Sequence, residues 1–271
     1  MTKTRRQMEA DLKQVDAVCE IVDARIPMAS RNPDIDVICG AKPRLIALNR
    51  MDLADPSVTK KWMQYFRGNG FATIATDCKS RKGVSDFQPE VRGILKEKIE
   101  RDAARGMNRP VRVMVVGIPN VGKSTLINQI SGRKGAKAEN RPGVTRGKQW
   151  VTVDNGLLLM DTPGILWPKF EDPEVGKLLA YTGAVKESVL DTEELAAALM
   201  ELLIRRYPQS LRDRYGVDTP GTGYELLEAA GRKRGYLLSG GHIDTERMAK
   251  VLLEEYRSGK LGRFTLEEPI I

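Results

Sequence analysis

Short runs of apolar, mostly β-branched residues recur along the first part of the chain. They occupy residues 17–22, 44–48, 72–76 and 111–116, and stretches with helix-like patterning, including 60–67 and 84–105, separate them. The runs show little alternation between apolar and polar positions, which is typical of strands buried on both faces of a sheet. Strands that alternate with helices predict a mostly parallel sheet with crossover helices.

Two further apolar runs form a different pattern. Residues 149–153 and 157–160 flank Asp154-Asn155-Gly156. An Asn-Gly pair between two apolar runs favours a hairpin, because both residues tolerate positive φ. The sequence therefore predicts one antiparallel pair of strands at the edge of the sheet.

From residue 172 onward the pattern becomes helical. Asp191 followed by Glu194 reads as a capping box at the start of one helix, and Asp244-Thr245 precedes a second helix. The apolar positions in helical register are Leu195, Leu199, Leu202 and Leu203 in the first helix and Met248, Val251, Leu252 and Tyr256 in the second. We therefore expect an α/β domain over residues 1–171 and a helical domain over residues 172–271.

The composition is that of an ordinary globular protein. Of 271 residues, 41% are hydrophobic and 30% charged, and no run approaches the ~18 apolar residues of a membrane span, which excludes a membrane protein. Cys19, Cys39 and Cys78 stand far apart without a CxxC pair, so neither a disulfide framework nor a zinc site is indicated. This cysteine usage predicts a reducing, cytoplasmic location.

Positive charge is concentrated in the predicted α/β domain. The chain has 44 basic and 36 acidic residues, a net charge of +8, and from Asp172 onward there are 14 basic and 17 acidic residues, or −3, which leaves +11 for residues 1–171. Such an excess predicts a polyanionic partner. The most basic stretch, residues 132–148, contains a single acid, and Arg232-Lys233-Arg234 is the best candidate for RNA contact in the second domain. In both places a solvated charge run is the alternative.

A phosphate-binding loop follows the run at residues 111–116. Residues 117–124 read GIPNVGKS, which matches GxxxxGK[ST] between a strand and a helix. Backbone N–H groups of such a loop close around the β-phosphate, the lysine bridges β- and γ-oxygens, and the serine ligates Mg²⁺. The candidate nucleotide-binding residues here are Gly117, Asn120, Val121, Gly122, Lys123, Ser124 and Thr125.

Two more motifs follow the ends of predicted strands. Residues 161–164 read DTPG, in which Asp161 would hold Mg²⁺ through water and the Gly164 N–H would sense the γ-phosphate; a plain turn or helix cap is the alternative. Residues 49–52 read NRMD, and Asp52 could accept both N1–H and N2–H of guanine. Adenine offers neither donor, so a buried carboxylate at this position would select guanine.

The order of these motifs is unusual. In familiar GTPases the phosphate loop precedes the guanine motif, whereas here residues 49–52 precede residues 117–124, which precede residues 161–164, so the domain looks circularly permuted. At this point the chain resembles the circularly permuted ribosome-assembly GTPases of the YlqF/RbgA type. The segments with this resemblance are DARIPMASRNP (23–33), NRMD, GIPNVGKST (117–125), RPGVTRGKQW (141–150), DTPGILWP (161–168) and HIDTERMAKVLLEEYRSGKLGR (242–263).

The resemblance implies further site residues and partners. It makes Thr145 the switch threonine on Mg²⁺, and Asp77-Cys78-Lys79 a second turn that contacts guanine, next to Asn49, Arg50 and Asp52. Arg50 stands where lysine is usual, and the two residues are not interchangeable. Lys123, Thr145 and Gly164 would act in catalysis. GTP or GDP, Mg²⁺ and, beside Asn120, K⁺ are the implied cofactors, and the large ribosomal subunit precursor, rRNA and proteins, is the implied partner.

We therefore predict a GTP hydrolase that acts as a switch in large-subunit assembly. The alternative is a nucleotide-gated RNA-binding scaffold with little hydrolysis. Ile165 and Leu166 follow Gly164, where many GTPases have a glutamine that orients water. The resemblance implies that a histidine in a Pro-Gly-His segment, upstream of the stretch matched by MTKTRRQ, takes that role. We expect this chain, which starts after that segment, to bind GTP normally and hydrolyse it slowly.

Overall fold

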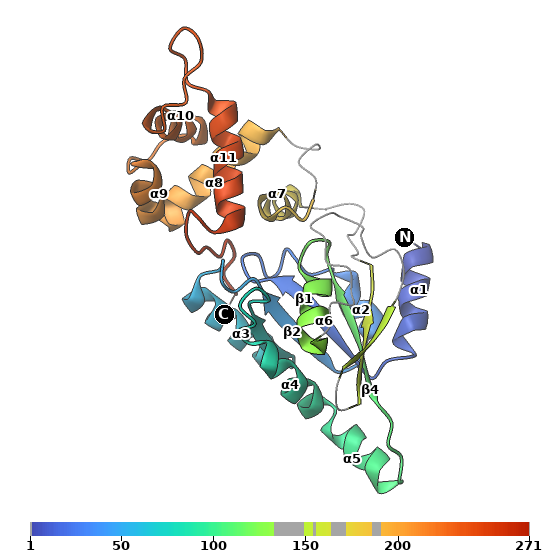
Figure 1. Ribbon diagram of the computed structural model, residues 1–271. Helices are drawn as coiled ribbons and strands as arrows, with labels where there is room; N and C mark the ends of the chain where they lie inside the picture. Colours follow the sequence, from blue (N-terminus) through green and yellow to red (C-terminus); the bar gives the residue numbers. More distant parts are fainter. Residues whose placement is uncertain (1, 133–148, 154–155, 164–171, 186–190, 271) are drawn as a thin grey trace. The chain divides into compact units, whose positions relative to one another are not determined.

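The chain folds into two compact units (Figure 1). The computed structural model describes residues 2–132, 149–153, 156–163, 172–185 and 191–270. The first unit comprises Met1–Glu171 together with Glu267–Ile271, and the second comprises Asp172–Leu266. Residues 267–271, which the sequence assigns to the helical domain, thus lie with the first unit.

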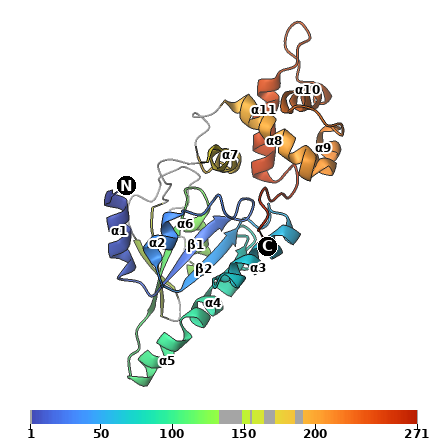
Figure 2. The ribbon, with the colours of Figure 1, turned by 180° about the vertical axis from the view of Figure 1, so that it is seen from behind.

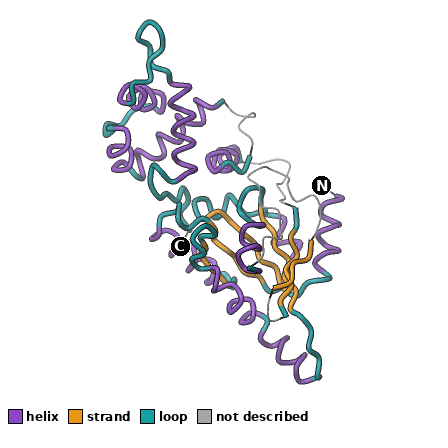
Figure 3. The backbone as a smooth tube through the Cα atoms, viewed as in Figure 1, coloured by secondary structure: helices purple, strands orange, loops and turns teal. Residues whose placement is uncertain are grey.

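A six-stranded sheet forms the centre of the first unit, and Figure 3 shows its strands in orange. The strands are β1 (Ala17–Asp23), β2 (Arg44–Asn49), β3 (Ala72–Thr76), β4 (Val111–Gly117), β5 (Gln149–Val153) and β6 (Leu157–Asp161). Their order is β3-β2-β1-β4-β6-β5, and all neighbours are parallel except β5 and β6. The predicted parallel sheet with one antiparallel edge pair is confirmed, while residues 154–155 of the predicted turn lie outside the described residues.

The strand order also confirms the permutation. Three strands precede β4 in the chain and lie on one side of it in the sheet, and the two that follow it lie on the other side. Counted from β4, the same sheet would be built in the order β4, β5, β6, β1, β2, β3, with the phosphate-loop strand first. The sheet therefore has the topology of a domain whose chain has been opened before β1.

Helices cover both faces of the sheet (Figures 1 and 2). They are α1 (Thr2–Leu12), α2 (Asp34–Cys39), α3 (Pro56–Gly68), α4 (Phe87–Ile94), α5 (Lys96–Ala104) and α6 (Lys123–Ser131). On one face α1 and α2 pack on Val18 and Met114, and α3 packs on Val22 and Ile46. On the opposite face α6 lies against β4, β5 and β6, and α4 against β2 and β3. Burial on both faces explains the unbroken apolar runs of the central strands.

The helix-like stretch predicted over residues 84–105 consists of three helical elements. A 3₁₀ turn (Val84–Asp86) is followed by α4 and α5, with a break at Leu95. Leu95 is buried, whereas no side chain of α5 is buried. Gly93, a poor helix former, precedes the break, and α5 continues away from the core without packing that would hold one continuous helix.

The second unit is helical in all its described residues apart from short connections. Its helices are α7 (Pro173–Thr182), α8 (Thr192–Arg206), α9 (Pro208–Tyr215), α10 (Gly223–Lys233) and α11 (Thr245–Ser258). The Asp191 carboxylate accepts a hydrogen bond from Glu194 N at 2.9 Å, and Asp244 caps α11 in the same way. A full capping box, Thr222 with Glu225, begins α10. None of the helices in the described residues is long and apolar enough to cross a membrane.

Candidate functional site

The predicted motifs converge at the carboxyl ends of the parallel strands. Ile21 of β1 pairs with Gly117, where β4 ends, and Asp23 pairs with Asn49, where β2 ends. Asn49 in turn pairs with Thr76 at the end of β3. Loops at the carboxyl ends of parallel strands form the ligand site of open α/β sheets. The phosphate loop, NRMD and residues 77–79 therefore share one edge.

The phosphate loop requires glycine at two positions. Gly117 and Gly122 have φ values of 154° and 101°. A Cβ on Gly117 would lie 2.6 Å from the Ile21 carbonyl oxygen, and a Cβ on Gly122 would lie 2.4 Å from Asn49 Nδ2. Gly122 is the N-cap of α6, whose first turn includes Thr125. The loop thus brings backbone N–H groups and a helix N-terminus to one place, which favours an anion.

Lys123 lies across this loop. Its Nζ donates hydrogen bonds to the carbonyl oxygens of Gly117 at 3.1 Å and Ile118 at 2.8 Å. Burial lowers the pKa of Lys123 to about 8, although the nearby Asp161 carboxylate opposes that shift. A poorly hydrated ammonium group in this position is available to phosphate oxygens, which would relieve the cost of its burial.

Ser124 and Asp161 meet beside the loop. Ser124 Oγ donates to Asp161 Oδ2 at 3.1 Å, and Asp161 Oδ1 is buried without a hydrogen-bond partner among the described residues. Burial raises the pKa of Asp161, and Ser124 and Lys123 only partly offset it. A hydroxyl and a buried carboxylate are hard oxygen ligands of the kind that Mg²⁺ takes. These two residues therefore fit the predicted magnesium site.

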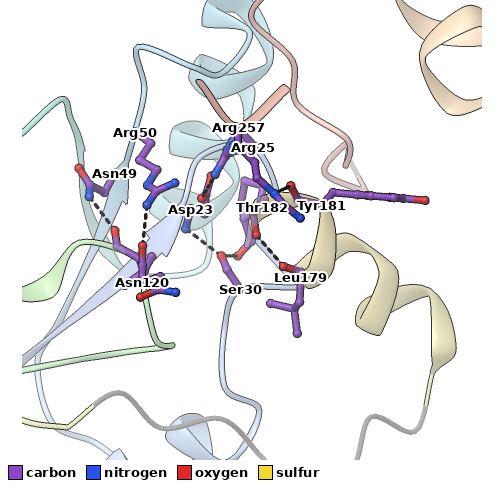
Figure 4. Close-up of polar contacts among 12 residues, drawn as sticks. Asp23, Arg25, Ser30, Asn49, Arg50, Asn120, Leu179, Tyr181, Thr182 and Arg257 are labelled. Carbon is purple, nitrogen blue, oxygen red and sulfur yellow. Dashed lines mark hydrogen bonds and ion pairs between the residues drawn. The ribbon is translucent and has the colours of Figure 1, made fainter. Parts of the chain in front are cut away.

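Asn49 joins three loops, and Figure 4 shows its bond to the phosphate loop. Its Nδ2 donates to the Val121 carbonyl oxygen at 2.7 Å. Its Oδ1 accepts from Thr76 Oγ1 at 3.1 Å and from Cys78 Sγ at 3.2 Å. The amide nitrogen and the amide oxygen thus both hold the loop after β2, the nitrogen against the phosphate loop and the oxygen against the end of β3 and the turn after it.

Arg50 makes a second link to the phosphate loop. It has φ 60°, and its Nη2 donates to the Asn120 carbonyl oxygen at 2.7 Å (Figure 4). Burial lowers the pKa of Arg50, and the Asp23 carboxylate opposes that shift. Asp52 is half-buried in the same loop. The loop backbone is fixed by the Met51 N–H, which donates to the Thr76 carbonyl oxygen at 3.1 Å.

The turn after β3 uses its three predicted residues differently. The Asp77 carboxylate accepts from Lys79 N at 2.8 Å and from Ser80 Oγ, so that the pKa of Asp77 is lowered although burial alone would raise it. Cys78 is buried, and burial raises the pKa of its thiol to about 12. Lys79 is exposed. Asp77 and Cys78 therefore build the turn, and Lys79 extends outward from it.

Some predicted residues lie outside the described residues. These are Thr145, Gly164 and the basic residues of 133–148. In the second unit, Arg234 of the predicted RNA-contacting triplet points inward, because its Nη2 lies 3.3 Å from Glu255 Oε1. Glu255 also accepts from Arg214 and from Tyr215 Oη. Arg234 is therefore partly buried beside Glu255, whereas Arg232 and Lys233 are exposed, and RNA contact by this triplet stays a prediction.

A buried ion pair that the sequence motifs did not predict lies beside NRMD. Arg25 Nε and Nη2 contact the two Asp23 carboxylate oxygens at 2.9 and 2.7 Å, and the Asp23 N–H donates to Ser30 Oγ at 2.9 Å (Figure 4). Burial would raise the pKa of Asp23, but Arg25 and Arg50 lower it below its usual range. The signal was the charged DAR triplet directly after a buried strand.

The sheet order and the joined loops define a circularly permuted P-loop GTPase. Residues 112–206 match the family described as 50S ribosome-binding GTPase. Ribosome biogenesis GTPase A of Priestia megaterium is 46% identical over 99% of this chain and 94% of its own length, and that of Thermotoga maritima is 33% identical over 98% of this chain and 91% of its own. The chain belongs to the ribosome biogenesis GTPase A family.

Solved structures agree with this assignment. A GDP-bound YlqF structure matches with a TM-score of 0.71 and 28% identity, covering 97% of this chain and 99% of that one. A GNP-bound YlqF from T. maritima matches with a TM-score of 0.67 and 29% identity, over 98% of each chain. The chain is thus a GTP hydrolase with a guanine-nucleotide site, as predicted.

Proposed function

We propose that this GTPase acts as a nucleotide-dependent switch on the large ribosomal subunit precursor. The observation that carries the proposal is the hydrogen bond from Asn49 to Val121, at 2.7 Å. It couples the predicted guanine loop (residues 49–52) to the phosphate loop (residues 117–124). A nucleotide can shift a two-state equilibrium only by binding the two states with different affinity, and these coupled loops are where the nucleotide would bind. The relatives named above are ribosome biogenesis GTPases, and mouse mitochondrial ribosome-associated GTPase 1 is 32% identical over this whole chain.

Within the site, each residue has a distinct task. Lys123 would bind the β- and γ-phosphates, and Asp52 would accept the guanine N1–H and N2–H, with Arg50 along the base. Ser124, Asp161 and Thr145 would hold Mg²⁺, which neutralises phosphate charge when bound. The Gly164 N–H would sense the γ-phosphate.

RNA is the partner that the charge favours. The first 171 residues have a net charge of +11, and six of the basic residues fall within 133–148. Phosphate contacts from such a surface supply most of the affinity for nucleic acid. We infer that these residues bind rRNA in the GTP state and that the helical unit is a second ribosome-contacting domain. The site of action would be the cytoplasm, where precursor particles are assembled.

Co-sedimentation with large-subunit precursor particles tests the switch. The protein should sediment with the particles in a non-hydrolysable GTP analogue and much less in GDP. Lys123→Ala should abolish this difference, since that lysine would bridge the phosphates, and Lys60→Ala is the matched control because Lys60 is exposed on α3 and belongs to none of the predicted nucleotide-binding motifs. Equal sedimentation of the wild type in both nucleotides would contradict the switch. Single-turnover hydrolysis with and without particles distinguishes a hydrolase from the nucleotide-gated scaffold.

A monovalent ion is a further expected cofactor. Asn120 adopts φ 60° at the tip of the phosphate loop, where an amide oxygen would help to hold K⁺ beside the phosphates. The ion would supply positive charge where an arginine finger otherwise acts. Hydrolysis should be faster in K⁺ than in Na⁺ at matched ionic strength, and Asn120→Ser should reduce that preference. Equal hydrolysis rates in the two salts would contradict a role for K⁺ in this site.

A further inference from the structure

The connection between α10 and α11 presents two leucines to solvent. It projects away from the helices of the second unit (Figure 1). Leu237 and Leu238 are 61% and 52% exposed as whole residues. Among the large hydrophobic residues that are exposed in the described parts of the chain, these two are the only adjacent pair. Single exposed hydrophobic residues need no explanation, but an adjacent pair on a projecting loop indicates a contact surface.

The exposure is imposed by an ordered turn. Leu238 N donates to the His242 carbonyl oxygen at 2.8 Å, and Gly241 N donates to the Leu238 carbonyl oxygen at 3.1 Å. Gly240 and Gly241 have φ values of 91° and 82°, which suit a tight reversal. The leucines are therefore held outward by backbone hydrogen bonds rather than left exposed by a frayed end.

The base of this hairpin is anchored in the helical core. Ile243, which forms a bridge with Leu237, is buried against Gly231, where a Cβ would lie 2.6 Å from Ile243 Cγ2. The Arg247 guanidinium lies 4.3 Å from the centre of the Tyr236 ring. The hairpin arm that carries the two leucines is thus fixed to the helical core, and the turn at residues 239–241 lies beyond them.

The surroundings of the tip are basic. Residues 231–243 contain three basic residues and no acidic one. Arg232 and Lys233, at the end of α10, are exposed, and so is Arg247 at the start of α11; Glu228, 3.8 Å from Arg232, and Glu246 are the neighbouring acids. Protein interfaces are depleted in lysine, whereas a basic rim complements a polyanion. Charge therefore favours a nucleic acid over a protein as the occupant of this surface.

We propose that Leu237 and Leu238 form an apolar wedge that contacts unstacked bases in the RNA of the large-subunit precursor, while Arg232 and Lys233 bind the flanking phosphates. Leucine is among the residues that enter between base steps when basic side chains flank them. RNA exposes such bases at bulges and loops, and the minor groove of its helices is wide and shallow. The wedge rests on the proposed ribosomal function and assigns to the helical unit a specific contact.

Binding to protein-free precursor rRNA over a series of salt concentrations tests the wedge. The double variant Leu237→Ser, Leu238→Ser should bind about tenfold more weakly, because apolar contact is lost. Its plot of log K against log salt should keep the wild-type slope, since no phosphate contact is removed. Arg232→Gln with Lys233→Gln should make the slope shallower by about two. Val37→Ser, at a residue that is 70% exposed in the first unit, is the matched control.

Three outcomes would overturn the wedge. Wild-type affinity in the double leucine variant, with an unchanged thermal unfolding curve, would remove the wedge and leave the proposed function intact. If the double leucine variant binds precursor particles more weakly than the wild type but binds protein-free rRNA normally, the leucines contact a ribosomal protein instead. Failure of the wild-type protein to bind either particles or rRNA in any nucleotide state would overturn the proposed function as well.

Discussion

Asp52 stands two residues after Arg50, whose guanidinium is bonded to the phosphate loop at 2.7 Å, so its carboxylate belongs to a loop of fixed position. Asp52→Asn should lower affinity for GTP and raise relative affinity for xanthosine triphosphate. Asparagine can donate to the O2 that replaces the guanine amine, whereas it cannot accept both guanine N–H groups. Competition of the two triphosphates against a fluorescent GDP measures the change.

The control for this substitution is Asp86→Asn. Asp86 is exposed in the 3₁₀ turn and lies outside the converging loops. It loses the same charge, so any general electrostatic effect on triphosphate binding appears in both variants. Unchanged preference for GTP in Asp52→Asn would show that another group reads the base.

Lys123 links function to stability through its pKa, which burial lowers to about 8. Between pH 8 and the ordinary lysine value near 10.4, the unfolded chain binds a proton that the folded chain does not, so this group raises stability as pH rises. Below pH 8 the buried charge of Lys123 lowers the free energy of unfolding of the nucleotide-free protein by at most about 3 kcal/mol. Lys123→Met should therefore weaken nucleotide binding and yet increase the free energy of unfolding at pH 7.

Urea denaturation of nucleotide-free protein checks the sign. The stability difference between Lys123→Met and wild type should be largest at pH 7 and should shrink as pH rises from 8 to 10. The Cys78 thiol ionises in this range only in the unfolded chain, because burial raises its pKa to about 12 in the fold, but this contribution is present in both proteins and cancels in the difference. A difference that does not change with pH would show that Lys123 is not desolvated in the fold.

At the scale of elements, the strands could be predicted and many of the links between loops could not. The strands are recognisable because double burial leaves unbroken apolar runs, and the motifs because phosphate chemistry needs a fixed spacing. The bond from Asn49 to Val121 joins residues 72 positions apart. Its existence depends on the strand order, which no local pattern encodes. The capping box at Thr222 and Glu225 could have been predicted from the sequence, because Thr-x-x-Glu is a local signal.

Helix α6 offers a matched pair of glycines for testing how the loops are joined. Gly122 and Gly132, at its two ends, both have positive φ, but a Cβ on Gly132 would meet nothing within 4 Å. Each change to alanine therefore brings backbone strain of ~1–3 kcal/mol. Gly122→Ala additionally displaces the buried Asn49 amide, and we expect it to lower the free energy of unfolding by about 1–3 kcal/mol more than Gly132→Ala.

Nucleotide affinity should separate the two variants more clearly than stability. Gly122→Ala disturbs the phosphate loop and the guanine loop together, so affinity for GDP should fall at least about tenfold, whereas Gly132→Ala should bind normally. Titration of a fluorescent GDP measures both. Similar affinities in the two variants would mean that the Asn49 link does not organise the site.

At the scale of the whole molecule, permutation places the second unit after DTPG (161–164), the segment predicted to sense the γ-phosphate. The chain leaves the first unit after β6, which ends at Asp161, and returns to it at Glu267. Any change that the γ-phosphate causes after Asp161 therefore acts on one covalent connection of the helical unit. The change to helical patterning at residue 172 predicted the first connection, whereas the return at Glu267 has no sequence signature.

Glu267 holds the returning chain segment against the first unit. Its Oε2 and Oε1 accept the N–H groups of Met28 at 2.8 Å and Ala29 at 2.9 Å, and its carbonyl oxygen accepts from Trp62 Nε1 at 3.1 Å. Hydrogen bonds to a charged group contribute about 1.5–3 kcal/mol. Because both N–H groups belong to the loop after β1, Glu267→Ala should lower the free energy of unfolding of the first unit by about 2 kcal/mol.

The neighbouring acid provides the control for this last prediction. Glu268 forms an ion pair with Lys61 at 3.4 Å, and both side chains are about half exposed, 49% and 50%. Exposed pairs contribute ~0–1 kcal/mol, so Glu268→Ala should leave stability nearly unchanged. Glu267→Gln keeps one acceptor oxygen and should fall between the two. Urea denaturation followed by Trp62 fluorescence reports on this contact, and equal losses in Glu267→Ala and Glu268→Ala would show that the tail is held by general charge rather than by the two backbone hydrogen bonds.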